Sequence, residues 1–130
     1  MDEDTSSVSL SDLQLDIMRV LWAAPDSTVV SVAEALRAER SLAHTTVATM
    51  LTRLEKRGVV AAKRDGRQLL YTALVSESQV QRSMVSGLLS SLFRGNASAL
   101  LSHLLREDEI GASDLEKMRA LLDKKDGRRD

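Results

Sequence analysis

The chain has 130 residues, no cysteine and a formal net charge of −1. Without cysteine it has no disulfide, no thiolate metal site and no thiolate nucleophile, and no apolar run approaches the roughly 20 residues that a membrane-spanning helix needs. The first residues, MDEDTSSVSLSD, are acidic, unlike the basic start of a secretory signal. We therefore expect a cytoplasmic protein with no membrane insertion.

The charge is unevenly distributed along the chain. Residues 1–36 carry a net charge of −6, residues 37–71 carry +5 and residues 72–130 carry 0. A basic stretch within a nearly neutral protein is typical of a surface that binds a polyanion. Nucleic acid is therefore the first partner to consider.

Two helices are predicted before the basic stretch. The first covers Ser11–Ala23, with Ser11 as its cap and one apolar side. Pro25 ends it. In the second, Ser31 followed three residues later by Glu34 predicts a capping box, and this short helix ends near residues 38–40.

A third helix is predicted over Leu42–Arg57, with Ser41 as its cap and Gly58 at its end. After Gly58 the apolar period changes from 3.6 to about 2, which indicates two strands joined by an Asp65-Gly66 hairpin turn. Three helices followed by a hairpin are the order of a winged helix-turn-helix domain. We expect a mostly α fold whose winged-helix DNA-binding domain occupies residues 1–75.

Residues 76–126 are predicted to be a small helical domain of three helices. Ser76 and Gln79 form a capping box for the first helix, Gly95-Asn96 ends it, and the sequence SDLE from Ser113 caps the last. About 50 residues rarely build a stable core alone. We favour burial of their apolar stripes in a homodimer, and the alternative is packing on the winged domain of the same chain. The predicted interface residues are Val80, Met84, Leu88, Leu92, Leu100, Leu101, Leu104, Leu105, Leu115, Met118, Leu121 and Leu122.

The predicted third helix has a side suited to a DNA groove. Opposite its apolar residues it carries small and basic residues and no acid, because Glu55 lies towards the edge of the apolar stripe. Threonines can approach base edges, Arg53 can reach a guanine or a phosphate, and basic residues of the hairpin can hold phosphates. The candidate DNA-binding residues are His44, Thr45, Thr46, Thr49, Thr52, Arg53, Lys56, Arg57, Lys63, Arg64 and Arg67.

Other interpretations remain open. A threonine-rich helix side and a basic turn are often merely exposed to solvent, and winged helices also serve as protein-interaction modules that bind no DNA. A small-molecule-responsive winged-helix regulator, with a ligand among the C-terminal helices, is a further alternative. An enzyme is not expected, since the two histidines, His44 and His103, have no metal-site spacing and no phosphate loop or acid pair occurs. No cofactor and no metal are expected.

The chain resembles the penicillinase-repressor family of BlaI/MecI/CopY-type transcriptional regulators. The resemblance rests on LSDLQLDIMRVLW, SVAEAL, HTTVATMLTRLEKRGVV and DGRQLLYTAL, in this order and spacing, and it extends from about Leu10 to Leu122. It implies a dimeric repressor that binds an inverted-repeat operator in double-stranded DNA, often with TACA/TGTA half-sites. By position, Thr46, Thr49 and Arg53 would contact bases.

The resemblance also implies, by position, that His44 and Thr45 lie near the DNA backbone and that Arg67 belongs to the wing. Family members linked to antibiotic resistance are inactivated by proteolysis of the dimerisation segment after a membrane sensor detects a β-lactam. The matching bond here is His103–Leu104, where the family's typical Asn-Phe pair is absent. Copper-sensing members use C-terminal cysteines, which this chain lacks.

Overall fold

The computed structural model describes residues 8–128, with side chains described to residue 125. The chain forms two compact units, the first ending at Val85 and the second beginning at Ser86. The first unit thus extends beyond residue 75, the end that the sequence predicts for the winged-helix domain. The reason is Val80, which is 1% exposed and belongs to the core of the first unit.

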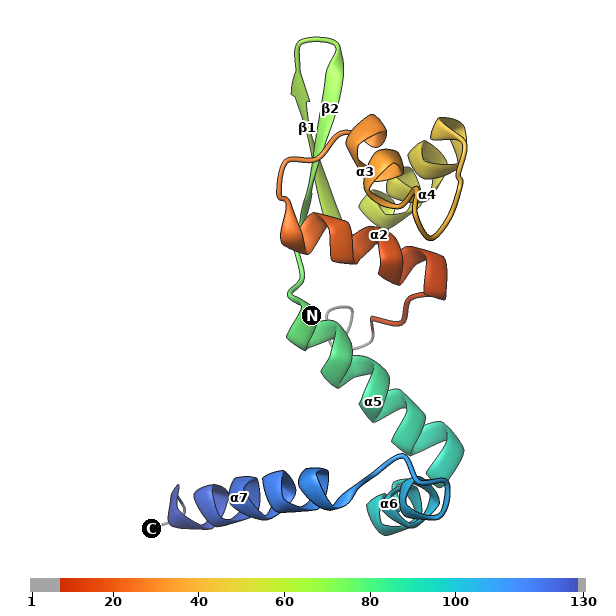
Figure 1. Cartoon of the computed structure of the whole chain (residues 1–130). Coiled ribbons are helices and arrows are strands. Elements are labelled where there is room, and N and C mark those ends of the chain that lie inside the picture. Colours follow the sequence, from red (N-terminus) through yellow and green to blue (C-terminus); the bar gives the residue numbers. More distant parts are fainter. Residues whose placement is uncertain (1–7, 129–130) are drawn as a thin grey trace. The chain divides into compact units, whose positions relative to one another are not determined.

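The first unit begins with three helices that lie beside a hairpin (Figure 1), namely α2 (Asp12–Ala23), α3 (Val29–Ala35) and α4 (His44–Lys56). Ser11 caps α2 as predicted, because its hydroxyl accepts from the Gln14 amide at 3.2 Å and the Gln14 side chain accepts from the Ser11 amide at 3.0 Å. Each helix turns apolar residues inward, as its 3.6-residue period requires.

Two predicted caps of the first unit are wrong. In α3, Thr28 is the N-cap and Ser31 its partner, with Thr28 Oγ1 accepting from the Ser31 amide at 3.0 Å. Ser31 and Glu34 therefore do not form the predicted capping box. Helix α4 has Ala43 at its N-cap, without a side-chain cap, so Ser41 lies outside the helix. In α3 a local pair three residues earlier forms the capping box, and α4 begins without any side-chain cap.

The wing is the antiparallel hairpin of β1 (Val60–Asp65) and β2 (Gln68–Ala73). Asp65 pairs with Gln68, so the two-residue loop is Gly66-Arg67 and the predicted Asp65-Gly66 turn is wrong by one residue. Gly66 has a φ of 64°, which glycine adopts without strain at the first loop position. Ser27 pairs with Tyr71 of β2 in an isolated antiparallel bridge. Its amide donates to the Tyr71 carbonyl at 3.1 Å, and its carbonyl accepts from the Tyr71 amide at 2.7 Å.

One apolar core lies between these three helices, the hairpin and the start of the next helix, α5 (Glu77–Phe93). The indole Nε1 of Trp22 also donates to the Val75 carbonyl at 2.9 Å, which ties α2 to the segment after the wing. The largest fully buried side chains are Ile17, Met18, Leu21, Val32, Val47, Leu51, Leu54, Val60 and Val80.

Three further helices follow the wing: α5 (Glu77–Phe93), α6 (Ala97–Arg106) and α7 (Ala112–Arg128). The predicted Ser76–Gln79 capping box is confirmed, with Ser76 Oγ accepting from the Gln79 amide at 3.0 Å. The predicted cap at Ser113 is wrong, because Ser113 lies inside α7 and the reciprocal bond runs from the Gly111 amide to Asp114 at 3.1 Å.

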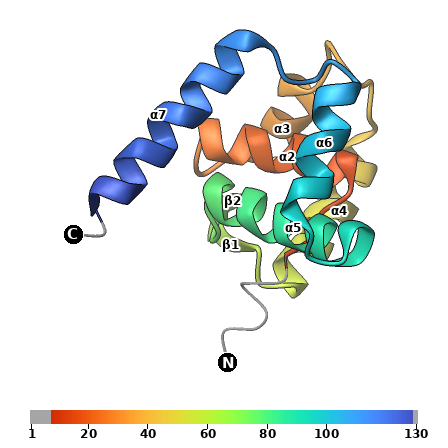
Figure 2. The same ribbon diagram turned by 90° about the horizontal axis from the view of Figure 1, so that it is seen from below.

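Helix α7 extends away from α6 in both views (Figures 1 and 2), and no residue from 86 to 125 is buried. No helix within the described residues is long and apolar enough to cross a membrane.

Candidate nucleic-acid interface

Helix α4 has one fully buried side and one exposed side. Val47, Leu51 and Leu54 are each 0% exposed and anchor the helix in the core of the first unit. On the opposite side and at both ends, the predicted DNA-binding residues are all exposed. These are His44, Thr45, Thr46, Thr49, Thr52, Arg53, Lys56 and Arg57. Helical periodicity identified this surface correctly, because a helix that packs with one side must present the other.

The threonine hydroxyls of α4 are partly engaged by their own helix. Thr49 Oγ1 donates to the Thr45 carbonyl and Thr52 Oγ1 donates to the Ala48 carbonyl, each at 2.9 Å. Such bonds to the preceding turn use the hydroxyl hydrogen. Towards a partner these threonines then present a hydroxyl oxygen, which can accept from an amino group, and a methyl group, which can contact thymine.

Five exposed basic residues of α4 and the wing have no ion pair among the described residues. They are Arg53, Lys56, Lys63, Arg64 and Arg67. By contrast, the three arginines that precede α4 are each bound to a carboxylate. Arg19 and Arg40 bind Asp16, and Arg37 binds Glu34. The basic stretch of the sequence thus contains arginines neutralised by a carboxylate and cations without an ion pair, and the latter lie on α4 and the wing.

Arg57 differs from these five cations. Its Nη2 donates to the Ser9 carbonyl at 3.0 Å. This bond holds the segment before α2 against the end of α4, next to Val8 and Leu10, which are 4% and 5% exposed. Arg57 therefore has a structural contact of its own, and its DNA contact stays a prediction.

The first turn of α4 is open to an external acceptor. Ala43 supplies no side-chain cap, while the Thr46 and Val47 amides donate to the Ala43 carbonyl at 3.0 and 3.2 Å. The unsatisfied amides at a helix start carry partial positive charge and suit a phosphate oxygen. The exposed side chains of His44 and Thr45 lie at this same end.

A groove of about 400 Å³ lies between α4, the start of α3 and the wing. Ala48 and Thr52 line it from α4, and Arg64 and Arg67 line it from the wing. Six further lining residues were not predicted as part of the site, namely Thr28, Val29, Val30, Gln68, Leu69 and Tyr71. Val30 is 51% exposed. Only the tertiary structure brings the start of α3 next to the wing, so no local pattern identifies these residues.

The penicillinase repressor family model matches residues 10–124 of the chain. The chain belongs to the penicillinase repressor family. It is therefore a member of a family of DNA-binding transcriptional repressors, which are not enzymes, and its three helices and hairpin form the winged helix of this family.

The family membership is supported by individual relatives. Transcriptional regulator BlaI of Mycobacterium tuberculosis is 36% identical over 115 residues, which cover 87% of this chain and 82% of that protein. Methicillin resistance regulatory protein MecI of Mammaliicoccus sciuri is 22% identical over 122 residues, which cover 94% and 99% of the two chains. The crystal structure of a mutant MarR from E. coli shares 17% identity and a TM-score of 0.50, covering 95% of this chain and 82% of that one. This last likeness concerns the fold alone.

The predicted dimer-interface residues of this penicillinase repressor family member fall into two groups. Val80 is 1% exposed within the core of the first unit, so its side chain is occupied by its own chain and does not belong to an interface. Met84 packs partly against the same core. The others lie in the second unit, which begins at Ser86 within α5, and are exposed or half-buried. They are Leu88, Leu92, Leu100, Leu101, Leu104, Leu105, Leu115, Met118, Leu121 and Leu122.

The predicted cleavage bond His103–Leu104 lies within α6. The His103 ring is edge-on to Phe93 with 6.3 Å between ring centroids, and the side chain is exposed, while Leu104 is half-buried. A protease needs an extended segment, so cleavage there requires that α6 opens locally.

Proposed function

We propose that the protein is a sequence-specific repressor that binds an inverted-repeat operator as a homodimer in the cytoplasm. The observation that carries the proposal is the surface of α4 and the wing, where exposed threonines adjoin five unpaired cations. Phosphates would replace water around these cations without breaking any internal ion pair, so DNA binding costs no protein contact there.

In the proposed complex, α4 enters the major groove and the wing holds the DNA backbone. Arg53 and Thr49 face the base edges, whereas Lys63, Arg64 and Arg67 contact phosphates. The open first turn of α4, with His44, adds a phosphate contact at the other end of the helix. Base contacts determine the sequence preference, and phosphate contacts determine most of the affinity.

The homodimer is supported by the second unit. No side chain between residues 86 and 125 is buried in the single chain, although the stretch is rich in leucine. Leu92, Leu121 and Leu122 are 67%, 66% and 60% exposed. Large exposed apolar side chains indicate a protein interface, and a second copy is the partner that an inverted-repeat operator demands.

The proposed release follows from this coupling between dimerisation and DNA binding. A dimer holds its second half-site at a high effective concentration once the first is bound, and a monomer loses this advantage. Loosening of the second unit, or proteolysis at His103–Leu104 by a protease or a membrane sensor, would therefore free the promoter.

The test is fluorescence anisotropy of the purified protein on the DNA upstream of its own gene. A scrambled duplex of equal length is titrated beside it, both at two salt concentrations. Tight, salt-sensitive binding that prefers the native duplex by orders of magnitude supports the proposal. Equal and weak binding to both duplexes, abolished by added salt, contradicts sequence specificity and favours the interaction-module interpretation.

A further inference from the structure

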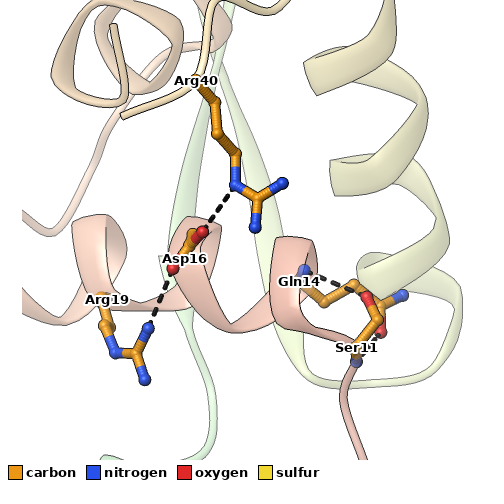
Figure 3. A network of polar contacts seen from close by, with 5 residues as sticks. All are labelled: Ser11, Gln14, Asp16, Arg19 and Arg40. Atoms are coloured by element: carbon orange, nitrogen blue, oxygen red, sulfur yellow. Dashed lines mark hydrogen bonds and ion pairs between the residues drawn. The ribbon is translucent and has the colours of Figure 1, made fainter. Parts of the chain in front are cut away.

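Asp16 of α2 joins two arginines in one network (Figure 3). Its Oδ2 accepts from Nε of Arg40 at 2.7 Å, and its Oδ1 accepts from Nη1 of Arg19 at 2.9 Å. Arg19 lies on the same helix, whereas Arg40 lies 24 residues away, in the segment between α3 and α4. The Asp16–Arg40 pair thus connects α2 to the segment that leads into α4.

The position of Arg40 matters because α4 has no local cap. Side chains cap the starts of α2, α3, α5 and α6, but α4 begins after Ala43 without such a bond. Arg40 also donates its backbone amide to the Leu36 carbonyl at 2.7 Å, which closes the turn after α3. Leu42 packs against the core. The start of α4 is therefore fixed by contacts of residues 40–42 with the rest of the first unit.

The Asp16–Arg40 pair differs from an ordinary surface ion pair. Its side chains are 17% and 38% exposed, and its partners belong to different elements. Arg37 and Glu34 form a pair of the ordinary kind, three residues apart at 3.3 Å, with side chains 73% and 57% exposed. Exposed pairs contribute little to stability, but a partly buried pair between two elements restricts their relative position.

We propose that Asp16 and Arg40 are positioning residues for operator recognition, which fix the start of α4 so that its first-turn residues meet the DNA in one register. The inference rests on the proposed function, because it concerns the specificity of that same interface. Neither side chain touches DNA in this proposal. Arg40 acts through residues 41–43 and the first turn of α4, where an error of about 1 Å misplaces a base contact.

Two matched variants separate position from charge. Asp16→Asn and Glu34→Gln each remove one negative charge, so both raise the long-range attraction to DNA equally. Glu34→Gln releases Arg37, whereas Asp16→Asn releases both Arg40 and Arg19. Only Asp16→Asn disconnects α2 from the approach to α4. Affinity is measured for the operator and for a scrambled duplex at two salt concentrations, and the ratio of the two affinities is the readout.

We expect Asp16→Asn to lower this specificity ratio by about 3- to 10-fold and Glu34→Gln to leave it unchanged. Since Asp16→Asn also releases Arg19, Arg19→Gln is included and should preserve the ratio. Arg40→Gln should lower the ratio as Asp16→Asn does, and the double variant should be no worse than either single one, because both remove the same contact.

Hydrogen exchange of the DNA-free protein provides a second measurement. The amides of residues 44–47 should exchange faster in Asp16→Asn than in Glu34→Gln. Arg40→Lys, which retains the charge but loses the guanidinium Nε donor, should behave like Asp16→Asn. An unchanged ratio in Arg40→Gln and Arg40→Lys overturns the inference even where Asp16→Asn does not fold. A wild-type protein without operator preference overturns the proposed function and this inference together, whereas normal wild-type preference with unaffected variants overturns the positioning role alone.

Discussion

At the scale of the residue, the proposed interface would separate side chains that read bases from side chains that only attract DNA. Arg53 lies on the exposed side of α4 among threonines, while Lys63 and Arg64 lie on the wing. None of the three has an ion pair among the described residues. The charges are equivalent, but in the proposed complex only Arg53 would reach the base edges, so the three residues should respond differently to substitution.

Arg53→Ala should weaken operator binding by about 1–3 kcal/mol and affect random DNA much less, because a base contact is removed. Anisotropy titrations on both duplexes measure the difference. Equal losses on the two duplexes would contradict base reading by Arg53.

Arg64→Ala should weaken binding to operator and random DNA alike, since a phosphate contact carries no sequence information. The slope of log K against log salt should fall by about 0.9 for each phosphate that the variant no longer neutralises. Lys63→Ala is the companion variant. A selective loss on the operator would show that the wing reads sequence.

At the scale of the element, the wing depends on its two-residue loop. Gly66 has a φ of 64°, and a Cβ added there would meet no atom within 4 Å. A substitution is therefore opposed only by the backbone conformation, which L side chains adopt at a cost. The position of the loop in turn determines where Arg64 and Arg67 stand.

Gly66→Ala should lower the free energy of unfolding by about 1 kcal/mol, because alanine is strained at positive φ. Thermal denaturation followed by circular dichroism measures the change. Gly87→Ala is the matched control, since Gly87 lies inside α5 with equal space around it, and alanine there should stabilise the helix by up to about 1 kcal/mol. Destabilisation by both variants would indicate a cause other than backbone conformation.

At the scale of the whole molecule, the two units differ in how their apolar residues are used. The first unit buries most of its large apolar side chains in one core, whereas the second buries none between residues 86 and 125. A unit without buried residues is marginal by itself. We therefore expect the second unit to be stable only in the dimer, so that a change that lowers dimerisation also lowers the stability of this unit.

Leu92→Glu should convert the dimer to a monomer and weaken operator binding, while binding to a single half-site is retained. Analytical ultracentrifugation reports the mass, and anisotropy reports the affinity. Leu74→Glu is the control, because Leu74 is 59% exposed but belongs to the first unit, against 67% for Leu92. A Leu92→Glu protein that stays dimeric would remove α5 from the interface.

Hydrophobic period, turn residues and charge distribution were sufficient to predict the order of the elements and the exposed side of α4. They are local properties, and each is determined by residues within one or two turns of one another. The sequence also indicated the Ser11 and Ser76 caps correctly, because both capping boxes are complete within four residues.

The tertiary structure alone decided the features that depend on distant residues. The wing turns at Gly66-Arg67, and Val80 enters the first core instead of an interface. Asp16 pairs with Arg40, 24 residues away in the sequence, and no local sequence pattern predicts this pair. The physical reason is that a buried contact or an ion pair between elements depends on how the elements pack, and packing is a property of the whole unit rather than of any one segment.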